Sequence, residues 1–292
     1  MQMNQEQLIE QNFPLMLLGL FFLAGIVIDI VLIIQFIARR NEWKGLSSTF
    51  SDRPWNHIDI GYLLIAALLP ITAIHTATYL AITYETATIA DIEAPVIILQ
   101  TALTHGLVLL IAWRLFRMKG ISSNEAFGIK SAGIAQNTSS GLMSYLAILP
   151  PVAVGAFITA YFIKKFNIEA PMQYPLKLLT GDYPFALKAF IVFAACISAP
   201  IVEEIFFRGV AMPFIARKTG TFASVIIVSL VFASIHMNLP SFLPIFFLSI
   251  GLSLAYILSG SLLTSIVMHS LFNTITLLVV LTIKNPEQFL LK

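Results

Sequence analysis

The sequence contains very little charge. Of its 292 residues, 11% are Asp, Glu, Lys or Arg, whereas 58% are hydrophobic. Soluble domains carry about 25% charged residues, and a soluble chain this apolar would expose large hydrophobic patches and aggregate. The composition therefore excludes an ordinary soluble globule and a disordered chain. A net charge of +2 is also too small for a nucleic-acid binder, so we expect no nucleic acid among the partners.

Cysteine is almost absent as well. The single cysteine, Cys196, excludes an intramolecular disulfide and any metal site built from several cysteine ligands.

Long apolar runs are abundant. A helix needs about 20 apolar residues to cross a bilayer, and eight runs approach or exceed that length. They cover approximately residues 13–37, 59–84, 94–114, 141–163, 185–207, 221–239, 241–258 and 261–283. We predict an all-α polytopic membrane protein of about eight transmembrane helices that enclose an intramembrane active site. Residues 1–292 form a single integral membrane domain in this interpretation, and the compact loops favour a bacterial inner membrane.

Charged residues inside the fifth run are the first functional signal. Each costs on the order of 3 kcal/mol at the centre of a span, so such residues usually pair, line a wet cavity or take part in chemistry. Glu204 and Arg208 are four residues apart, share a helix face and can pair. Glu203 is turned by about 100° from Glu204 and is free to face another group.

The sixth run ends in a second signal. Phe232 and His236 lie on one helix face. Glu204 lies 16 residues before the turn at Thr219-Gly220, and His236 lies 16 residues after it. If both arms are continuous antiparallel helices, these two side chains are at the same depth.

The last run contains His269 and Asn273, which are four residues apart on one face. Asparagine is costly in hydrocarbon unless it is hydrogen-bonded. The depth of this pair does not match that of His236, because the seventh run is about 27 Å long and His269 is about 12 Å past the final turn. Pro240 and Pro244 could break or tilt the seventh helix and remove the mismatch.

These three signals fit hydrolysis of a carbonyl compound, most simply a peptide bond. A carboxylate and an imidazole can share a water and remove its proton. A second imidazole and an amide can donate hydrogen bonds to the oxyanion that develops.

The motifs Glu-Glu-x-x-x-Arg, Phe-x-x-x-His and His-x-x-x-Asn, in this order on successive apolar helices between residues 203 and 273, resemble the CAAX protease and bacteriocin-processing family. That family includes the type II CAAX prenyl endopeptidases. The resemblance implies an eight-span helical intramembrane endopeptidase with a catalytic core at about 185–283. It also implies that Glu203 activates water with help from His236.

The resemblance further implies that Glu204 and Arg208 support the site and that His269 and Asn273 form the oxyanion hole. The implied substrate is a membrane-associated protein, either a prenylated CAAX-type protein or a bacteriocin-like leader peptide. The family is often classed as metalloendopeptidases, and Glu203, His236 and His269 could hold zinc. The sequence lacks a His-Glu-x-x-His motif, and asparagine is a poor zinc ligand, so we favour a mechanism without a metal or other cofactor.

Three other functions are compatible with the same residues. A non-proteolytic membrane scaffold or a bacteriocin self-immunity protein would keep the motifs without catalysis. A proton-coupled transporter also places Glu, His and Arg in the membrane, although the motifs are not repeated in two halves. A rhomboid-type serine protease would need a reactive serine, for which Ser253 is a weak match.

Overall fold

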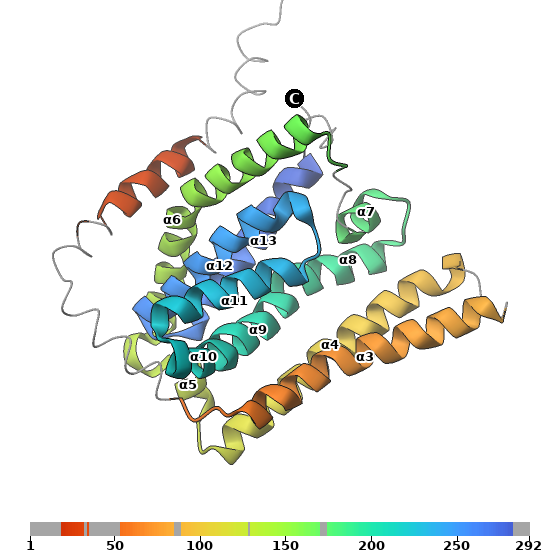
Figure 1. Ribbon diagram of the computed structural model, residues 1–292, viewed down its shortest axis with the longest axis horizontal. Helices are drawn as coiled ribbons and strands as arrows, with labels where there is room; N and C mark the ends of the chain where they lie inside the picture. The colour runs from red at the N-terminus through yellow and green to blue at the C-terminus, as the bar shows by residue number, and fades with distance from the viewer. Residues whose placement is uncertain are drawn as a thin grey trace, which may run out of the picture.

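The computed structural model describes residues 19–31, 34, 53–84, 89–127, 129–169 and 174–282. Every regular element in these ranges is a helix (Figure 1). Six stretches are long and apolar enough to cross a membrane: His57–Thr83, Ile92–Met118, Gly133–Phe166, Phe185–Thr219, Leu239–Ser259 and Leu262–Thr282. The helices Gly19–Val31 and Thr221–Ile235 are apolar but shorter. The prediction of an all-α polytopic membrane protein is confirmed, and each predicted run overlaps one of these eight stretches.

Helices α3 (His57–Thr83) and α4 (Ile89–Met118) pack side by side along most of their length (Figure 1). Asn56 caps α3, since its side chain accepts hydrogen bonds from the backbone N–H groups of Ile58 and Asp59. Asp59 accepts a bond from the Asn56 N–H in return and pairs with Lys119 at 3.1 Å. Asp59 therefore completes the cap of α3 and ties it to Lys119, directly after α4.

Helix α6 (Ile129–Phe166) follows the short α5 (Ser123–Ala126) and packs against α12 (Leu239–Ser259) and α13 (Leu262–Thr282). Glycines allow close approach at this interface. A Cβ on Gly155 would lie 2.8 Å from Phe247 of α12, and one on Gly251 of α12 would lie 2.5 Å from Ile148 of α6. Small residues at such contacts are typical of helices that pack within membranes.

The central structural feature is a continuous helical rod of 35 residues, Phe185–Thr219. It is preceded by α7 (Tyr174–Thr180). The rod consists of five successive elements: α8 (Phe185–Phe193), the π-helical turn η1 (Ala194–Ser198), α9 (Ala199–Glu204), the π-helical turn η2 (Ile205–Ala211) and α10 (Met212–Thr219).

The chain reverses direction after the rod. Gly220 has a φ of 82°, a left-handed value that glycine adopts without strain. Helix α11 (Thr221–Ile235) then runs back along α10 and packs against α12. The predicted turn at Thr219-Gly220 is thus confirmed, and the rod, α11, α12 and α13 surround the residues that the motifs contain.

One polar contact ties the start of the rod to α4. The Tyr183 hydroxyl, in the loop before α8, donates a 2.7 Å hydrogen bond to Glu93. This bond to a carboxylate raises the pKa of Tyr183 above its ordinary value of 10.

Candidate active site

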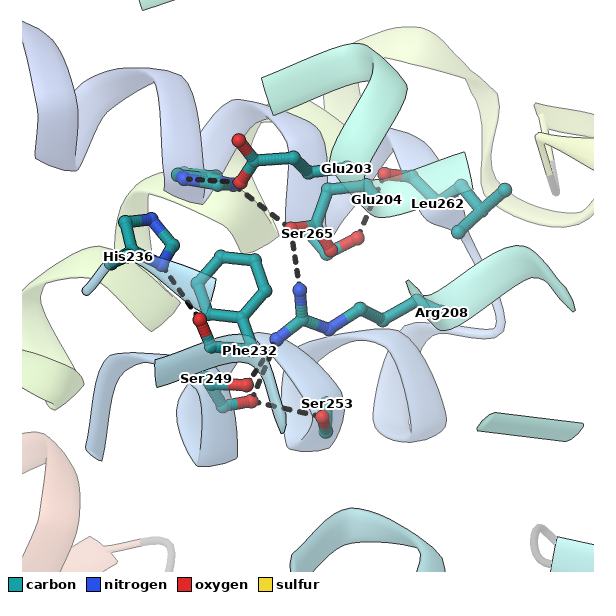
Figure 2. Close-up of polar contacts among 10 residues, drawn as sticks. Glu203, Glu204, Arg208, Phe232, His236, Ser249, Ser253, Leu262 and Ser265 are labelled. Carbon is teal, nitrogen blue, oxygen red and sulfur yellow. Dashed lines mark hydrogen bonds and ion pairs between the residues drawn. The ribbon is translucent and has the colours of Figure 1, made fainter. Parts of the chain in front are cut away.

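Both adjacent glutamates lie at the end of α9, between the two π-helical turns of the rod. Single π-helical turns within α-helices occur frequently at functional sites, because they redirect side chains without ending the helix. In the close-up, Glu203 and Glu204 extend from neighbouring positions to different surroundings (Figure 2).

Glu204 and Arg208 form a fully buried ion pair. Arg208 Nη1 lies 2.9 Å from Glu204 Oε1, and both side chains are 0% exposed. Arg208 Nη2 donates to the backbone carbonyl and to the hydroxyl of Ser249 on α12, at 3.0 and 2.7 Å. The predicted pairing is therefore confirmed, and it joins the rod to α12.

Glu203 has different surroundings. Its side chain is 26% exposed, and its Oε2 is buried without a hydrogen-bond partner in the part of the chain that the structure describes. This oxygen is 3.9 Å from His269 Nε2, beyond hydrogen-bonding distance. Glu203 thus has a partly exposed side chain with one buried oxygen that no described side chain satisfies.

His236 follows the last residue of α11. Its Nδ1 is 2.6 Å from the Phe232 carbonyl oxygen. A carbonyl only accepts hydrogen bonds, so Nδ1 carries the proton and Nε2 of the neutral ring is an acceptor. The residue is exposed, which leaves Nε2 free to bind a water.

Phe232 connects the parts of the site. Its ring centroid is 4.9 Å from that of His236, 5.8 Å from that of His269 and 4.7 Å from Arg208 Cζ. One aromatic ring thus contacts residues of α11, α13 and the rod, as Figure 2 shows for Phe232, His236 and Arg208. The antiparallel arrangement predicted for the rod and α11 brings the motifs of both together.

His269 reaches the glutamates directly. Its Nδ1 donates to Glu204 Oε1 at 2.9 Å, so Glu204 accepts from both Arg208 and His269 through the same oxygen. The predicted depth mismatch is therefore absent. Helix α12 is not broken, since Pro240 lies in its first turn and Pro244 lies within uninterrupted helix.

The position at which α12 ends removes the mismatch. Leu262, the first residue of α13, contacts Gly209 of the rod, so α12 ends well below the turn at Gly220. Strictly parallel helices would place the end of α12 level with that turn, whereas packed helices cross at angles. Helix α13 then runs antiparallel to the rod, with Leu262 near Gly209, His269 at Glu204 and Asn273 at Ala195.

Asn273 does not face the carboxylates. Its Nδ2 donates a 2.8 Å hydrogen bond to the backbone carbonyl of Ala195 in η1. The predicted role of Asn273 as an oxyanion donor stays a prediction, and one of its two amide hydrogens is engaged elsewhere.

Several residues outside the motifs contribute to the site. The hydroxyl of Ser249 binds Arg208, and His105 Nδ1 on α4 lies 2.7 Å from the Ser198 hydroxyl in η1. His105 thus forms a polar contact between α4 and the rod. His75 instead bonds Ile71 O of its own helix at 2.8 Å. Nothing in the sequence distinguishes Ser249 from the other serines of the apolar runs.

Ser253 does not resemble a nucleophile. It is fully buried, and its hydroxyl donates to the Ser249 carbonyl of its own helix at 2.9 Å. An activated serine would donate to a base instead.

The metal candidates do not converge. Among the described residues, no three His, Cys, Asp or Glu side chains are arranged to hold a metal ion. Glu203, His236 and His269 therefore do not fit a three-ligand zinc site in this geometry, and His269 Nδ1 is already engaged with Glu204. A mechanism without a metal stays a prediction.

Comparison with family models adds evidence for the rod and the helices that follow it. The model described as type II CAAX prenyl endopeptidase Rce1-like matches residues 185–275. Residues 185–275 are thus similar to this family. The Rce1-like segment contains all three motifs and begins at the first residue of the rod. The match indicates an intramembrane protease in general and, together with the apolar helices, an integral multi-pass membrane protein. Comparisons with curated proteins and with solved structures found no match.

Proposed function

We propose that this protein is an intramembrane endopeptidase that cleaves a peptide bond of a membrane-associated substrate by glutamate-activated water. The contrast between the adjacent glutamates carries this proposal. The Glu204 side chain is 0% exposed and paired with Arg208, whereas the Glu203 side chain is 26% exposed and forms no ion pair with an arginine or lysine among the described residues. A buried ion pair alone would suit a structural role, but a second carboxylate, 3.9 Å from the His269 imidazole, suits catalysis.

Water activation needs two acceptors that converge on one molecule. Glu203 offers a carboxylate oxygen, and His236 offers Nε2 because its Nδ1 proton is held by the Phe232 carbonyl. A water that donates one hydrogen to each is oriented with its lone pairs toward the substrate. Glu203 takes the proton as the water oxygen attacks the peptide carbonyl, and the same proton then goes to the leaving amine.

The ion pair holds the base in place. Glu204 cannot exchange roles with Glu203, because Arg208 and His269 both bind its Oε1. Since Arg208 is fixed in turn by Ser249, the end of α9 is linked to α12 and α13. The catalytic carboxylate therefore sits on a rigid element, as productive water attack requires.

The proposed oxyanion donor is His269. Its Nδ1 proton is bound to Glu204, so Nε2 can donate to the oxyanion only when both ring nitrogens carry a proton, whereas the Asn273 amide is bound to the Ala195 carbonyl. The proposed substrate class is the prenylated CAAX-type protein, supported by the Rce1-like match. The proposed location is a bacterial inner membrane, on the basis of the compact loops.

The test is cleavage of a prenylated C-a-a-X peptide by the purified protein in detergent or vesicles. We expect Glu203→Gln to lower turnover by about 10²- to 10⁴-fold, the usual contribution of a general base, with unchanged thermal stability. Glu93→Gln is the matched control, since Glu93 lies on α4 and binds Tyr183. Unchanged turnover in Glu203→Gln would reject the mechanism.

Two further results separate the alternatives. Loss of turnover in Ser253→Ala with a stable fold would favour a serine protease. Failure of the wild-type protein to cleave prenylated peptides and leader peptides alike would favour a scaffold or self-immunity protein. Sequencing of new C-termini in membranes with active protein, or with the Glu203→Gln variant, distinguishes ends at prenylated cysteines from ends within leader peptides.

A further inference from the structure

Two prolines in the rod remove backbone donors on either side of the glutamates. Pro200 is the second residue of α9, and Pro213 is the second residue of α10. Proline has no N–H, so each leaves a carbonyl of the preceding turn without its helical hydrogen bond. An unsatisfied carbonyl within a membrane-spanning helix costs free energy unless another group donates to it.

The carbonyl of Ala195 has no helical donor. The residue four positions on is Ala199, and its N–H bonds Ala194 O in the π-helical register. The residue five positions on is Pro200. The donor that completes Ala195 O is Asn273 Nδ2 from α13, at 2.8 Å.

The carbonyl of Gly209, on the other side of the glutamates, lacks its α-helical donor. The residue four positions on is Pro213, and the N–H of Met212 bonds Phe207 O. The donor to Gly209 O is the indole Nε1–H of Trp55, at 2.7 Å. Trp55 is 1% exposed, lies just before α3 and contacts Phe116 with ring centroids 5.4 Å apart.

We propose that Asn273 and Trp55 are positioning residues that set the orientation of α9, and with it of Glu203, by hydrogen-bonding the carbonyls of Ala195 and Gly209. These two bonds lie on either side of Ala199–Glu204, one from α13 and one from the segment before α3. This inference deepens the proposed function, and its activity readout rests on that function. It assigns Asn273 a role through the backbone of the rod in place of direct contact with the oxyanion.

The two prolines provide a rescue experiment. Asn273→Leu keeps the volume and removes the donor, so we expect the unfolding equilibrium constant to rise about tenfold, as for one lost hydrogen bond, and kcat to fall with little change in KM. In Pro200→Ala/Asn273→Leu, the new backbone N–H gives the turn a donor, so we expect both quantities to recover at least halfway on a logarithmic scale. An oxyanion donor could not be rescued in this way.

The control is Pro244→Ala/Asn273→Leu. Pro244 lies within α12, so its replacement adds a backbone N–H remote from Ala195, and we expect no recovery. Equal recovery with Pro244→Ala, or no recovery with Pro200→Ala in either quantity, would overturn the assignment for Asn273. Recovery of stability without recovery of kcat would indicate that Asn273 donates to the oxyanion. That result would also overturn the positioning role.

The role of Trp55 can be tested independently of Asn273. Trp55→Phe keeps an aromatic ring and removes the N–H, whereas Trp113→Phe, on the exposed face of α4, is the matched control. We expect Trp55→Phe to raise the unfolding equilibrium constant severalfold, and the double variant Trp55→Phe/Pro213→Ala to restore it. We expect Trp113→Phe to leave it unchanged. An identical effect of both tryptophan variants would overturn the assignment for Trp55.

Unfolding in mixed detergent micelles does not depend on substrate. If the wild-type protein cleaves no peptide but Pro200→Ala still restores the stability of Asn273→Leu, the proposed function fails and the hydrogen-bond assignment stands. If the wild-type protein cleaves peptide and no rescue occurs, the proposed function stands and the positioning role fails.

Discussion

The α3–α4 hairpin and the segment from the rod to α13 are equally apolar but differ in what they bury. The best spanning windows of α3 and α4 have 17% and 11% of their residues buried, against 28% in the rod and in α13. Most of the buried polar side chains in the described ranges lie between Glu204 and His269, whereas α4 contributes none. The hairpin presents its apolar side chains outward, as a lipid-facing element does, and the later segment encloses polar groups that hydrocarbon would penalise.

Hydropathy therefore identifies the segments that can span the membrane, but it does not identify the active site. The site is found where polar groups are satisfied by other helices: Arg208 by Ser249, Glu204 by His269 and the Ala195 carbonyl by Asn273. In the hairpin, hydroxyls such as that of Thr72 bond carbonyls of their own helix. Substitutions in the two regions should therefore lower the free energy of unfolding by different amounts.

The largest effect on stability is expected for Glu204→Gln. It preserves the shape but leaves the Arg208 charge buried without a counter-charge, which costs about 3–5 kcal/mol. Unfolding in mixed micelles measures the change. Glu203→Gln is the control, because Glu203 is partly exposed and has no cationic partner within the rod. The double variant Glu204→Gln/Arg208→Met should be less destabilised than Glu204→Gln alone, and a larger loss in the double variant would show that the ion pair is not the cause.

An intermediate effect is expected for leucine truncation. Leu252 of α12 is 0% exposed and packs with the cluster around Tyr145 and Met268, so Leu252→Ala should cost about 2–5 kcal/mol. Leu110 of α4 is 56% exposed, so Leu110→Ala should change stability by about 0.5 kcal/mol or less. Comparable losses from the two variants, measured by the same titration, would mean that the outer face of α4 is covered by protein.

The smallest effect is expected at the start of the hairpin. Asn56→Ala removes the acceptor for two backbone N–H groups of α3, which typically costs about 1 kcal/mol. Hydrogen exchange of the first turn of α3 should accelerate, whereas exchange in α9 should not. Thr72→Ala is the control within the same helix. Faster exchange in both α3 and α9 would show that the hairpin and the rod unfold together.

Much of the fold was predictable from the sequence. The eight apolar stretches, the turn at Gly220 and the Glu204–Arg208 pair follow from hydropathy and from helical periodicity, which are local properties. The contact between His269 and Glu204 was not predictable, because it depends on the position at which α12 ends beside the rod. The roles of Ser249 and Trp55 carry no sequence signal, since each is defined by a partner more than 40 residues away.

Composition and residue spacing establish that this is a membrane protein and which residues form the motifs, because lipid constrains composition and a helix places side chains four residues apart on one face. The tertiary structure decided which glutamate is sealed and which remains accessible. It also decided that His269 binds Glu204 and that Asn273 binds the Ala195 carbonyl. The physical reason is that contacts between helices depend on crossing angles and on the extra residue in each π-helical turn, and neither is encoded in the spacing of residues along one helix.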